Sequence, residues 1–289
     1  MLQVARLAPQ LLSDSTELVR DFVLSKLNDD GGFQDRVGES DLYYTVFGLE
    51  CLLAVDAEIP VEKVKPYLQS FADGASLDLV HLTSLIRCWS NLKCDFEAEG
   101  LREPFLNQLE RFRAADGGFN TEENAEVGTG YAAFLVYGAL QELKEPVKNE
   151  KLLIESIQEL QVGNGSYGMT KGQTEGTTPT TAAACVALYD LGIKNLEASR
   201  RWLWNNYNLQ GGGFFAIPNA PMPDLLSTAT ALHTLSTMGE QFKDIEDSCL
   251  DFIDSLWTNS GSFYGTWADD ILDVEYTLYG LLALGHLAV

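Results

Sequence analysis

A short turn made of glycine and an aromatic residue recurs along this chain and constrains its fold more than any other feature. Its copies are Gly31-Gly32-Phe33, Gly117-Gly118-Phe119, Gly165-Ser166-Tyr167, Gly212-Gly213-Phe214 and Gly261-Ser262-Phe263. Glycine takes backbone angles that other residues avoid, so each copy predicts a tight reversal. The copies are evenly spaced except for one double-length step, in which Asp73-Gly74-Ala75-Ser76 stands where a further turn is expected. Repeats of roughly 43–49 residues are typical of two-helix units.

Helical patterns flank the first turn on both sides. Before it, apolar residues recur at helical spacing and predict a helix with one buried face. These residues are Leu18, Val19, Phe22, Val23 and Leu27. After it, Ser40 or Asp41 can cap a helix that begins with two tyrosines and runs to about Val55. The unit is therefore predicted to be a helix, a glycine turn and a second helix.

The repeat divides residues 1–289 into six units of a single domain. The units span about 15–55, 60–93, 101–143, 150–191, 196–238 and 245–287. The second helices are apolar on nearly every face, which indicates burial, and the first helices carry charge on one side, which indicates an outer layer. An open stack needs polar repeats at its ends, and neither end has one. We therefore predict an all-α fold, an α/α toroid of six helical hairpins (an α6/α6 barrel), in preference to an open HEAT-like stack.

Composition excludes several classes of partner. The formal net charge is −23, from 19 Lys and Arg against 42 Asp and Glu. Such a charge repels nucleic acid and disfavours anionic membranes. No apolar run reaches the ~18 residues needed to span a bilayer, and the first residues lack the pattern of a secretory signal. We therefore expect a cytoplasmic protein.

The cysteines do not form a recognisable metal or disulfide motif. They are Cys51, Cys88, Cys94, Cys185 and Cys249, and no two stand in a CxxC pair. Most lie in apolar helical runs, where buried reduced thiols are expected. A zinc site made of four cysteines is not expected.

Motifs in the first two units carry a family resemblance. Gly32-Phe33-Gln34-Asp35-Arg36 precedes Asp41-Leu42-Tyr43-Tyr44-Thr45, and Asp78-Leu79-Val80-His81 begins the equivalent helix of the next unit. Over nearly its whole length the chain resembles the β subunits of protein prenyltransferases, within the wider prenyltransferase/squalene-cyclase group. The resemblance implies an isoprenoid diphosphate in a central apolar cavity and transfer of its prenyl group to a thiol or other acceptor. It also implies an α-helical partner subunit, with a homodimer as the other expected assembly.

The resemblance assigns substrate-binding roles to several residues. Arg36 falls on the arginine that contacts the diphosphate, and Tyr44 on the tyrosine that binds it. A ring of inner helices leaves an axis that something must occupy, so Tyr43, Tyr131 and Tyr276 are expected to line the isoprenoid cavity; the alternative is that they fill it as core side chains.

The resemblance also implies a zinc ion that activates the acceptor thiol as a thiolate. In the family an aspartate, a cysteine and a histidine hold this ion. Asp41 and His81 fall on two of these positions, and Tyr43 stands where the cysteine is expected. Glu275 is a further candidate ligand, because a ring places the sixth unit beside the first.

Each of these residues also has a purely structural interpretation. An aspartate at a helix start is commonly an N-cap, which applies to Asp41, Asp78, Asp224 and Asp273. A single histidine on an apolar helix, such as His81, is more often a hydrogen-bonded core residue than a ligand. Asp269-Asp270-Ile271-Leu272-Asp273 matches a magnesium-diphosphate motif, for which chance in an acidic chain is the simpler explanation.

Three functions follow from these alternatives. The first is a prenyltransferase-like enzyme with Arg36 and Tyr44 on the diphosphate and Asp41 and His81 on zinc. The second is a non-catalytic toroid that binds an isoprenoid or a protein and has lost the zinc-thiolate chemistry. The third is a toroid hydrolase or lyase that uses paired carboxylates such as Asp41 and Asp273. The acid motif D-x-D-D of protonation-initiated cyclases is absent, which argues against a squalene-cyclase activity.

Overall fold

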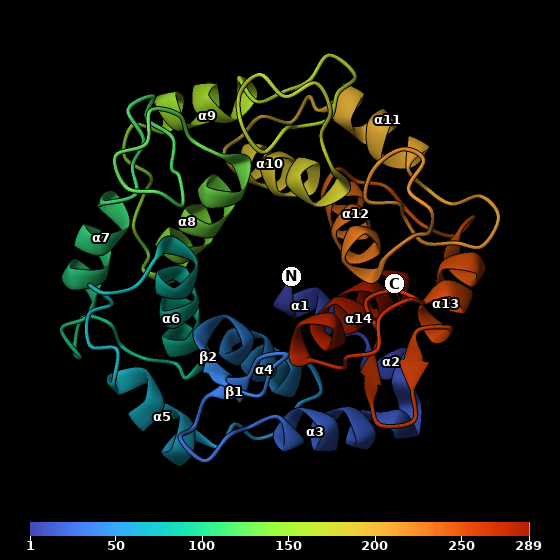
Figure 1. Cartoon of the computed structure of the whole chain (residues 1–289), viewed down its shortest axis with the longest axis horizontal. Helices are drawn as coiled ribbons and strands as arrows, with labels where there is room; N and C mark the ends of the chain where they lie inside the picture. Colours follow the sequence, from blue (N-terminus) through green and yellow to red (C-terminus); the bar gives the residue numbers. More distant parts are fainter. Residues whose placement is uncertain (289) are drawn as a thin grey trace.

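The computed structural model describes residues 1–288, and these residues form two concentric rings of helices (Figure 1). The inner ring consists of α4 (Leu42–Ala54), α6 (Leu79–Asn91), α8 (Gly130–Glu142), α10 (Thr178–Asp190), α12 (Leu225–Thr237) and α14 (Val274–Leu287). The outer ring consists of α3 (Thr16–Ser25), α5 (Val61–Gln69), α7 (Arg102–Glu110), α9 (Glu150–Gln158), α11 (Glu197–Asn205) and α13 (Glu246–Asp254). Inner and outer helices alternate along the chain.

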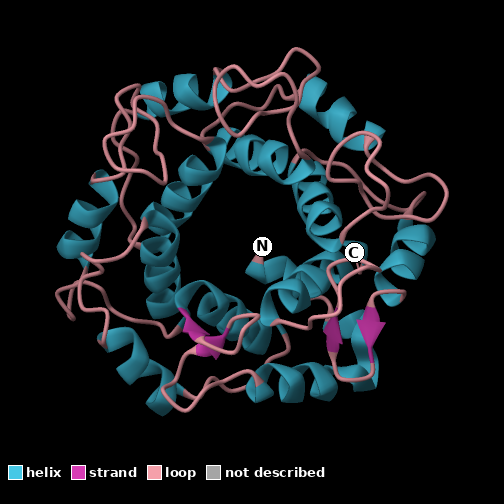
Figure 2. Cartoon of the chain, viewed as in Figure 1, coloured by secondary structure: helices cyan, strands magenta, loops and turns pink. Residues whose placement is uncertain are grey.

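The ring is closed. Each inner helix packs against the next, and α14 packs against α4 as well as α12. The predicted all-α toroid is therefore confirmed, and the open stack is excluded. Short antiparallel strands occur at two of the turns (Figure 2), where β1 (Phe33–Gln34) pairs with β2 (Ser40–Asp41) and β3 (Trp257–Thr258) pairs with β4 (Ser262–Phe263). The limits of the six predicted units and their status as one domain stay predictions.

The glycine-aromatic turn has a specific packing role. Gly31 has φ +95°, and a Cβ there would lie 2.0 Å from the carbonyl oxygen of Lys63 on the next outer helix. The Phe33 ring is fully buried against Gly48 of α4, where a Cβ would lie 2.4 Å from the ring. The backbone N–H of Phe33 donates to Thr45 Oγ1 at 2.9 Å. The turn therefore joins its own inner helix to the following outer helix.

The same contact joins the last unit to the first. Gly261 has φ +91°, and a Cβ there would lie 2.1 Å from the carbonyl oxygen of Leu18 in α3. The Phe263 ring packs against Gly280 of α14 as Phe33 packs against Gly48. Because the closing contact repeats the internal ones, it explains why the chain forms a ring.

The first residues form a segment that the repeat pattern did not predict. α1 (Leu2–Ala5) and α2 (Pro9–Leu12) are followed by a 3₁₀ turn, Ser13–Ser15. α1 packs against α14 and α4, and Gly285 near the end of α14 allows the Val4 carbonyl to approach closely. Of this segment, α1 therefore lies at the C-terminal end of the inner helices. No helix within residues 1–288 has the length and apolar character needed to cross a membrane.

Candidate functional site

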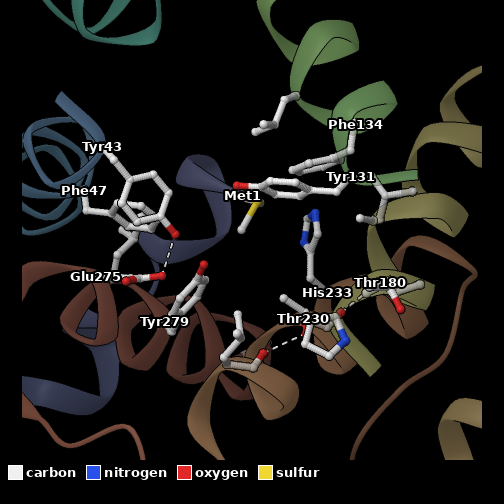
Figure 3. Close-up of a pocket in the computed structure, with 18 of the residues that line it drawn as sticks. Met1, Tyr43, Phe47, Tyr131, Phe134, Thr180, Thr230, His233, Glu275 and Tyr279 are labelled. Atoms are coloured by element: carbon white, nitrogen blue, oxygen red, sulfur yellow. Dashed lines mark hydrogen bonds between the residues drawn. The ribbon is translucent and has the colours of Figure 1, made fainter. Parts of the chain in front are cut away.

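A central cavity of about 310 Å³ lies inside the inner ring. Its wall is mainly apolar and aromatic, with Tyr43 and Phe47 on one side, Tyr131 and Phe134 on another, and Met1 between them (Figure 3). The remaining lining residues are Arg87, Leu135, Met169, Pro179, Thr180, Ala182, Ala183, Val186, Leu226, Thr230, His233, Thr234, Glu275, Leu278 and Tyr279. The volume is at the lower end of the range of small-molecule pockets.

The inner helices present their N-terminal ends at one rim of the ring, which we call the mouth of the cavity. Asp41 and Asp78 cap α4 and α6, Asp224 and Asp273 cap α12 and α14, and threonines cap α8 and α10. Capping therefore accounts for all four aspartates noted in the sequence. α1 lies at the opposite end of the inner helices.

A carboxyl group faces the cavity near its mouth. The Tyr43 hydroxyl donates a hydrogen bond of 2.6 Å to Glu275 Oε1. Burial raises the pKa of Glu275 above its ordinary value, and the bond from Tyr43 only partly opposes this effect. Burial also raises the pKa of Tyr43, which keeps the phenol protonated as a donor. The wall therefore offers a weakly acidic carboxyl group rather than a free cation at this point.

Arg36 lies at the mouth but is held by two acidic side chains. Its Nε donates to Asp273 Oδ2 at 2.7 Å and its Nη2 donates to Asp269 Oδ2 at 2.8 Å. The guanidinium carbon also lies 5.1 Å from the centre of the Tyr276 ring. The string from Asp269 to Asp273 thus has a structural role as the partner of Arg36. Tyr44 is beside Tyr43, and burial raises its pKa to about 12.

His81 bridges two aspartates at the same rim. Its Nε2 lies 3.0 Å from Asp41 Oδ2 and its Nδ1 lies 2.8 Å from Asp78 Oδ2. The hydrogen bond to Asp41 is the largest effect that raises the pKa of His81, to about 9. Burial acts to raise the pKa of Asp41, but hydrogen bonds from His81 and the backbone lower it overall. The group is therefore an imidazolium between two carboxylates at neutral pH.

The deep end of the cavity holds polar residues that the sequence analysis did not select. Arg87 pairs with Glu50 through Nη2, and both side chains arise from inner helices that are otherwise largely apolar. His233 Nδ1 lies 3.0 Å from His286 Nε2, and burial lowers the pKa of both rings. A charged residue far from the capped end of an apolar helix was the sequence signal that could have identified Glu50 and Arg87.

The family model for the prenyltransferase alpha-alpha toroid domain matches residues 5–72, 79–212 and 192–287. The chain belongs to the prenyltransferase alpha-alpha toroid family. This confirms the resemblance to the prenyltransferase/squalene-cyclase group. No curated protein sequence matches the chain.

Several solved structures share the fold of this chain. A type II terpene cyclase from Scytonema in complex with geranylgeranyl dihydroxybenzoate has a TM-score of 0.65 and 15% identity, covering 97% of this chain and 97% of that chain. Candida albicans protein geranylgeranyltransferase-I complexed with GGPP has a TM-score of 0.64 and 16% identity, covering 84% of this chain and 85% of that chain. A protein from Actinoplanes has a TM-score of 0.65 and 14% identity, covering 95% and 98%. At these identities the likeness concerns the fold.

The residues present do not fit the three-ligand zinc site of the protein prenyltransferases in this family. Asp41 Oδ1 accepts from the backbone of Tyr43 and Tyr44, and its Oδ2 faces His81. Tyr43, at the position of the family cysteine, is bonded to Glu275. Within residues 1–288 no group of three or more His, Cys, Asp or Glu side chains is arranged to hold a metal ion.

The predicted site residues fall into two sets. The wall of the cavity contains Tyr43, Tyr131 and Glu275. The inner-helix starts and the adjoining turn at the mouth carry Arg36, Asp41, Tyr44, His81 and Tyr276. The structure brings Asp41 to His81, Tyr43 to Glu275, and Arg36 to Tyr276. Their roles toward a ligand stay predictions.

Proposed function

We propose that this protein binds an isoprenoid chain in its central cavity. The observation that carries the proposal is a cavity inside the toroid whose wall is built from aromatic and aliphatic side chains of the inner helices. Apolar walls with a few convergent polar groups are typical of small-molecule sites. The solved relatives named above contain GGPP and geranylgeranyl dihydroxybenzoate, which supports an isoprenoid over other apolar ligands.

The side chains support isoprenoid binding without zinc-dependent prenyl transfer better than they support the transfer reaction. The positions of the family's zinc ligands are engaged with one another or with backbone groups, as Asp41 is with His81. Arg36 is likewise engaged with Asp269 and Asp273, so the proposal is limited to the isoprenoid chain and does not include the diphosphate. These contacts also occupy Asp41 and Asp273, the carboxylates of the hydrolase alternative. A partner subunit or a homodimer stays a prediction.

A binding measurement with farnesol as the probe tests the proposal. Wild-type protein is expected to bind farnesol by isothermal titration calorimetry, with a negative heat-capacity change from apolar burial. Ala183 lines the cavity, and Ala183→Phe is expected to block binding because the added ring fills the space. The control is Ala98→Phe at an exposed position. Equal binding by both variants, or no binding by folded wild-type protein, would exclude the cavity as an isoprenoid site.

A further inference from the structure

Arg87 offers hydrogen-bond donors to the deep part of the cavity. It lines the cavity, and 26% of its side chain is exposed. Its Nη2 donates to Glu50 Oε1, and within residues 1–288 its Nε and Nη1 have no hydrogen-bond partner. Nε and Nη1 are not among the buried side-chain atoms that lack a hydrogen-bond partner, so neither atom is fully enclosed by protein. These donors are therefore accessible to a ligand in the cavity.

The charge of Arg87 is already balanced. Glu50 is only 5% exposed and forms an ion pair with the guanidinium, so the deep end carries no net charge from this pair. The Met1 ammonium group also lies at this end, where it interacts with the Glu50 and Asp190 carboxylates, and burial lowers its pKa. Two cations therefore face two carboxylates, and an anionic head group placed there would add a negative charge without a partner in a largely apolar space, which is unfavourable. A neutral oxygen accepts from Arg87 without adding a charge, and hydrogen bonds to charged donors are among the stronger ones.

The two cationic side chains described at the mouth, Arg36 and His81, are already paired with carboxylates. The Arg36 guanidinium donates to both Asp269 and Asp273, and His81 lies between Asp41 and Asp78. A diphosphate carries several negative charges and is normally held by several cationic donors. The net charge of −23 further opposes the approach of a polyanion.

We infer that the ligand is an isoprenoid with an uncharged oxygen, an alcohol or a carbonyl, and that this oxygen accepts a hydrogen bond from Arg87 at the deep end of the cavity. The inference rests on the proposed isoprenoid binding and adds the chemistry and orientation of the head group. The hydrocarbon chain then extends toward the mouth along the wall that contains Phe47, Phe134 and Tyr131.

A comparison of three ligands with the same chain tests the head group. Farnesol, farnesyl diphosphate and the hydrocarbon farnesene are titrated into wild-type protein. Farnesol is expected to bind about tenfold more tightly than farnesene, the ratio that one hydrogen bond to a charged donor gives. It is also expected to bind more tightly than farnesyl diphosphate. Tighter binding of farnesyl diphosphate would overturn the inference and leave isoprenoid binding intact, whereas failure of all three ligands would exclude isoprenoid binding itself.

A paired variant tests the role of Arg87. Arg87→Leu with Glu50→Leu removes both charges of the ion pair together, so neither partner is left buried without the other. It is expected to bind farnesene normally and to lose the preference for farnesol. The matched control is Arg200→Leu with Glu240→Leu, which removes an ion pair of 2.5 Å outside the cavity wall and should keep the preference. A preference that survives in the Arg87 pair variant would overturn the assignment.

A single conservative change covers the case in which the paired variant does not fold. Arg87→Lys keeps a positive charge beside Glu50 but removes the planar fork of guanidinium donors. The ratio of farnesol to farnesene affinity is expected to fall at least about threefold in this variant. An unchanged ratio in folded Arg87→Lys protein would overturn the assignment in the same way.

Discussion

Arg36 and Asp273 are 237 residues apart in the chain, yet Arg36 Nε donates a hydrogen bond of 2.7 Å to Asp273 Oδ2. The same guanidinium donates to Asp269 through Nη2 at 2.8 Å. Arg36 follows β1 in the first turn, and both aspartates precede α14. One arginine side chain therefore spans the junction between the two ends of the repeat array.

Removal of this arginine is expected to destabilise the closed ring. Arg36→Leu leaves Asp273, which is 2% exposed, without its cationic partner. We expect a loss of about 2–3 kcal/mol in the free energy of unfolding, less than for a fully buried pair because Arg36 is partly exposed. Urea denaturation followed by circular dichroism measures this loss.

Two further variants control that measurement. Arg20 pairs with Asp21 on the exposed surface, so Arg20→Leu is expected to leave the free energy of unfolding nearly unchanged. Arg36→Leu combined with Asp273→Asn keeps an N-cap side chain on α14 but removes the unpaired charge, and should recover part of the loss. A value for Arg36→Leu as small as that of Arg20→Leu would refute the role of the junction pair.

The contribution of His81 is expected to depend on pH. Its pKa rises from 6.5 to about 9 on folding, mainly through the hydrogen bond to Asp41. A group with a raised folded pKa stabilises fully below its unfolded pKa and loses this effect as the pH rises through its folded pKa. The stability difference between wild type and His81→Gln should therefore be about 1–2 kcal/mol near pH 6, allowing for partial solvent exposure, and shrink toward pH 10.

NMR titration of the histidine ring checks the same point directly. The His81 signals are expected to titrate near pH 9, whereas His286 should titrate near pH 4 because burial lowers its pKa. A His81 midpoint near 6.5, or a stability difference that is constant from pH 6 to 10, would contradict the bridge between the aspartates.

Gly261 should tolerate no side chain. Gly261→Ala combines a φ of +91° with a Cβ only 2.1 Å from the Leu18 carbonyl oxygen, so the turn must move away from α3. We expect a loss of about 3 kcal/mol or more, from strain together with lost packing. Gly138→Ala in α8 is the comparison, since a Cβ there meets no atom within 4 Å. This variant should increase the free energy of unfolding by about 0.5–1 kcal/mol, because alanine favours the helix over glycine. Similar melting temperatures for the two variants would count against the packing of Gly261 on α3.

The Tyr43 hydroxyl is expected to matter more than that of its neighbour. Tyr43→Phe removes the donor to Glu275 and leaves this half-buried carboxyl group less well satisfied, at a cost of about 1–2 kcal/mol. The pKa of Glu275 should rise further, because Tyr43 acts to lower it. Tyr44→Phe is the control, since the Tyr44 hydroxyl makes no hydrogen bond within residues 1–288. Carboxyl-labelled NMR and urea denaturation measure the two effects, and equal results for both variants would contradict the pairing.

The fold was predictable because its rules are local and repeated. Gly31 indicates a turn with a positive φ, and Asp41 indicates the start of a helix. The apolar residues of the helix that follows indicate that it is buried. The closing contact at Gly261 follows the same pattern as the internal turns, so the ring could be predicted from the units. The segment before residue 15 has no counterpart in the repeat, which is why its packing on α14 was not predicted.

The site was predictable only for residues whose place within the repeat unit determines where they lie in the ring. Tyr43 and Glu275 each lie in the first turn of an inner helix, and the ring places them together. The partners of Arg36 lie at the far end of the chain, and no spacing rule distinguishes a ligand-binding arginine from one bonded to aspartates. The pairing of Glu50 with Arg87 likewise depends on which helices are neighbours in the ring. The local sequence pattern around each residue does not identify its partner.

The docking of Gly261 on α3 means that this architecture has no intrinsic first unit. The chain ends only determine which junction between neighbouring hairpins lacks a covalent link. In a relative whose chain begins and ends at another junction of the ring, the equivalent side chain would belong to a hairpin with a different number in the sequence order. Transfer of a role such as that of Arg36 between relatives therefore requires superposition of the rings in every rotation, because reading two sequences from their first residues can pair hairpins that do not correspond in space.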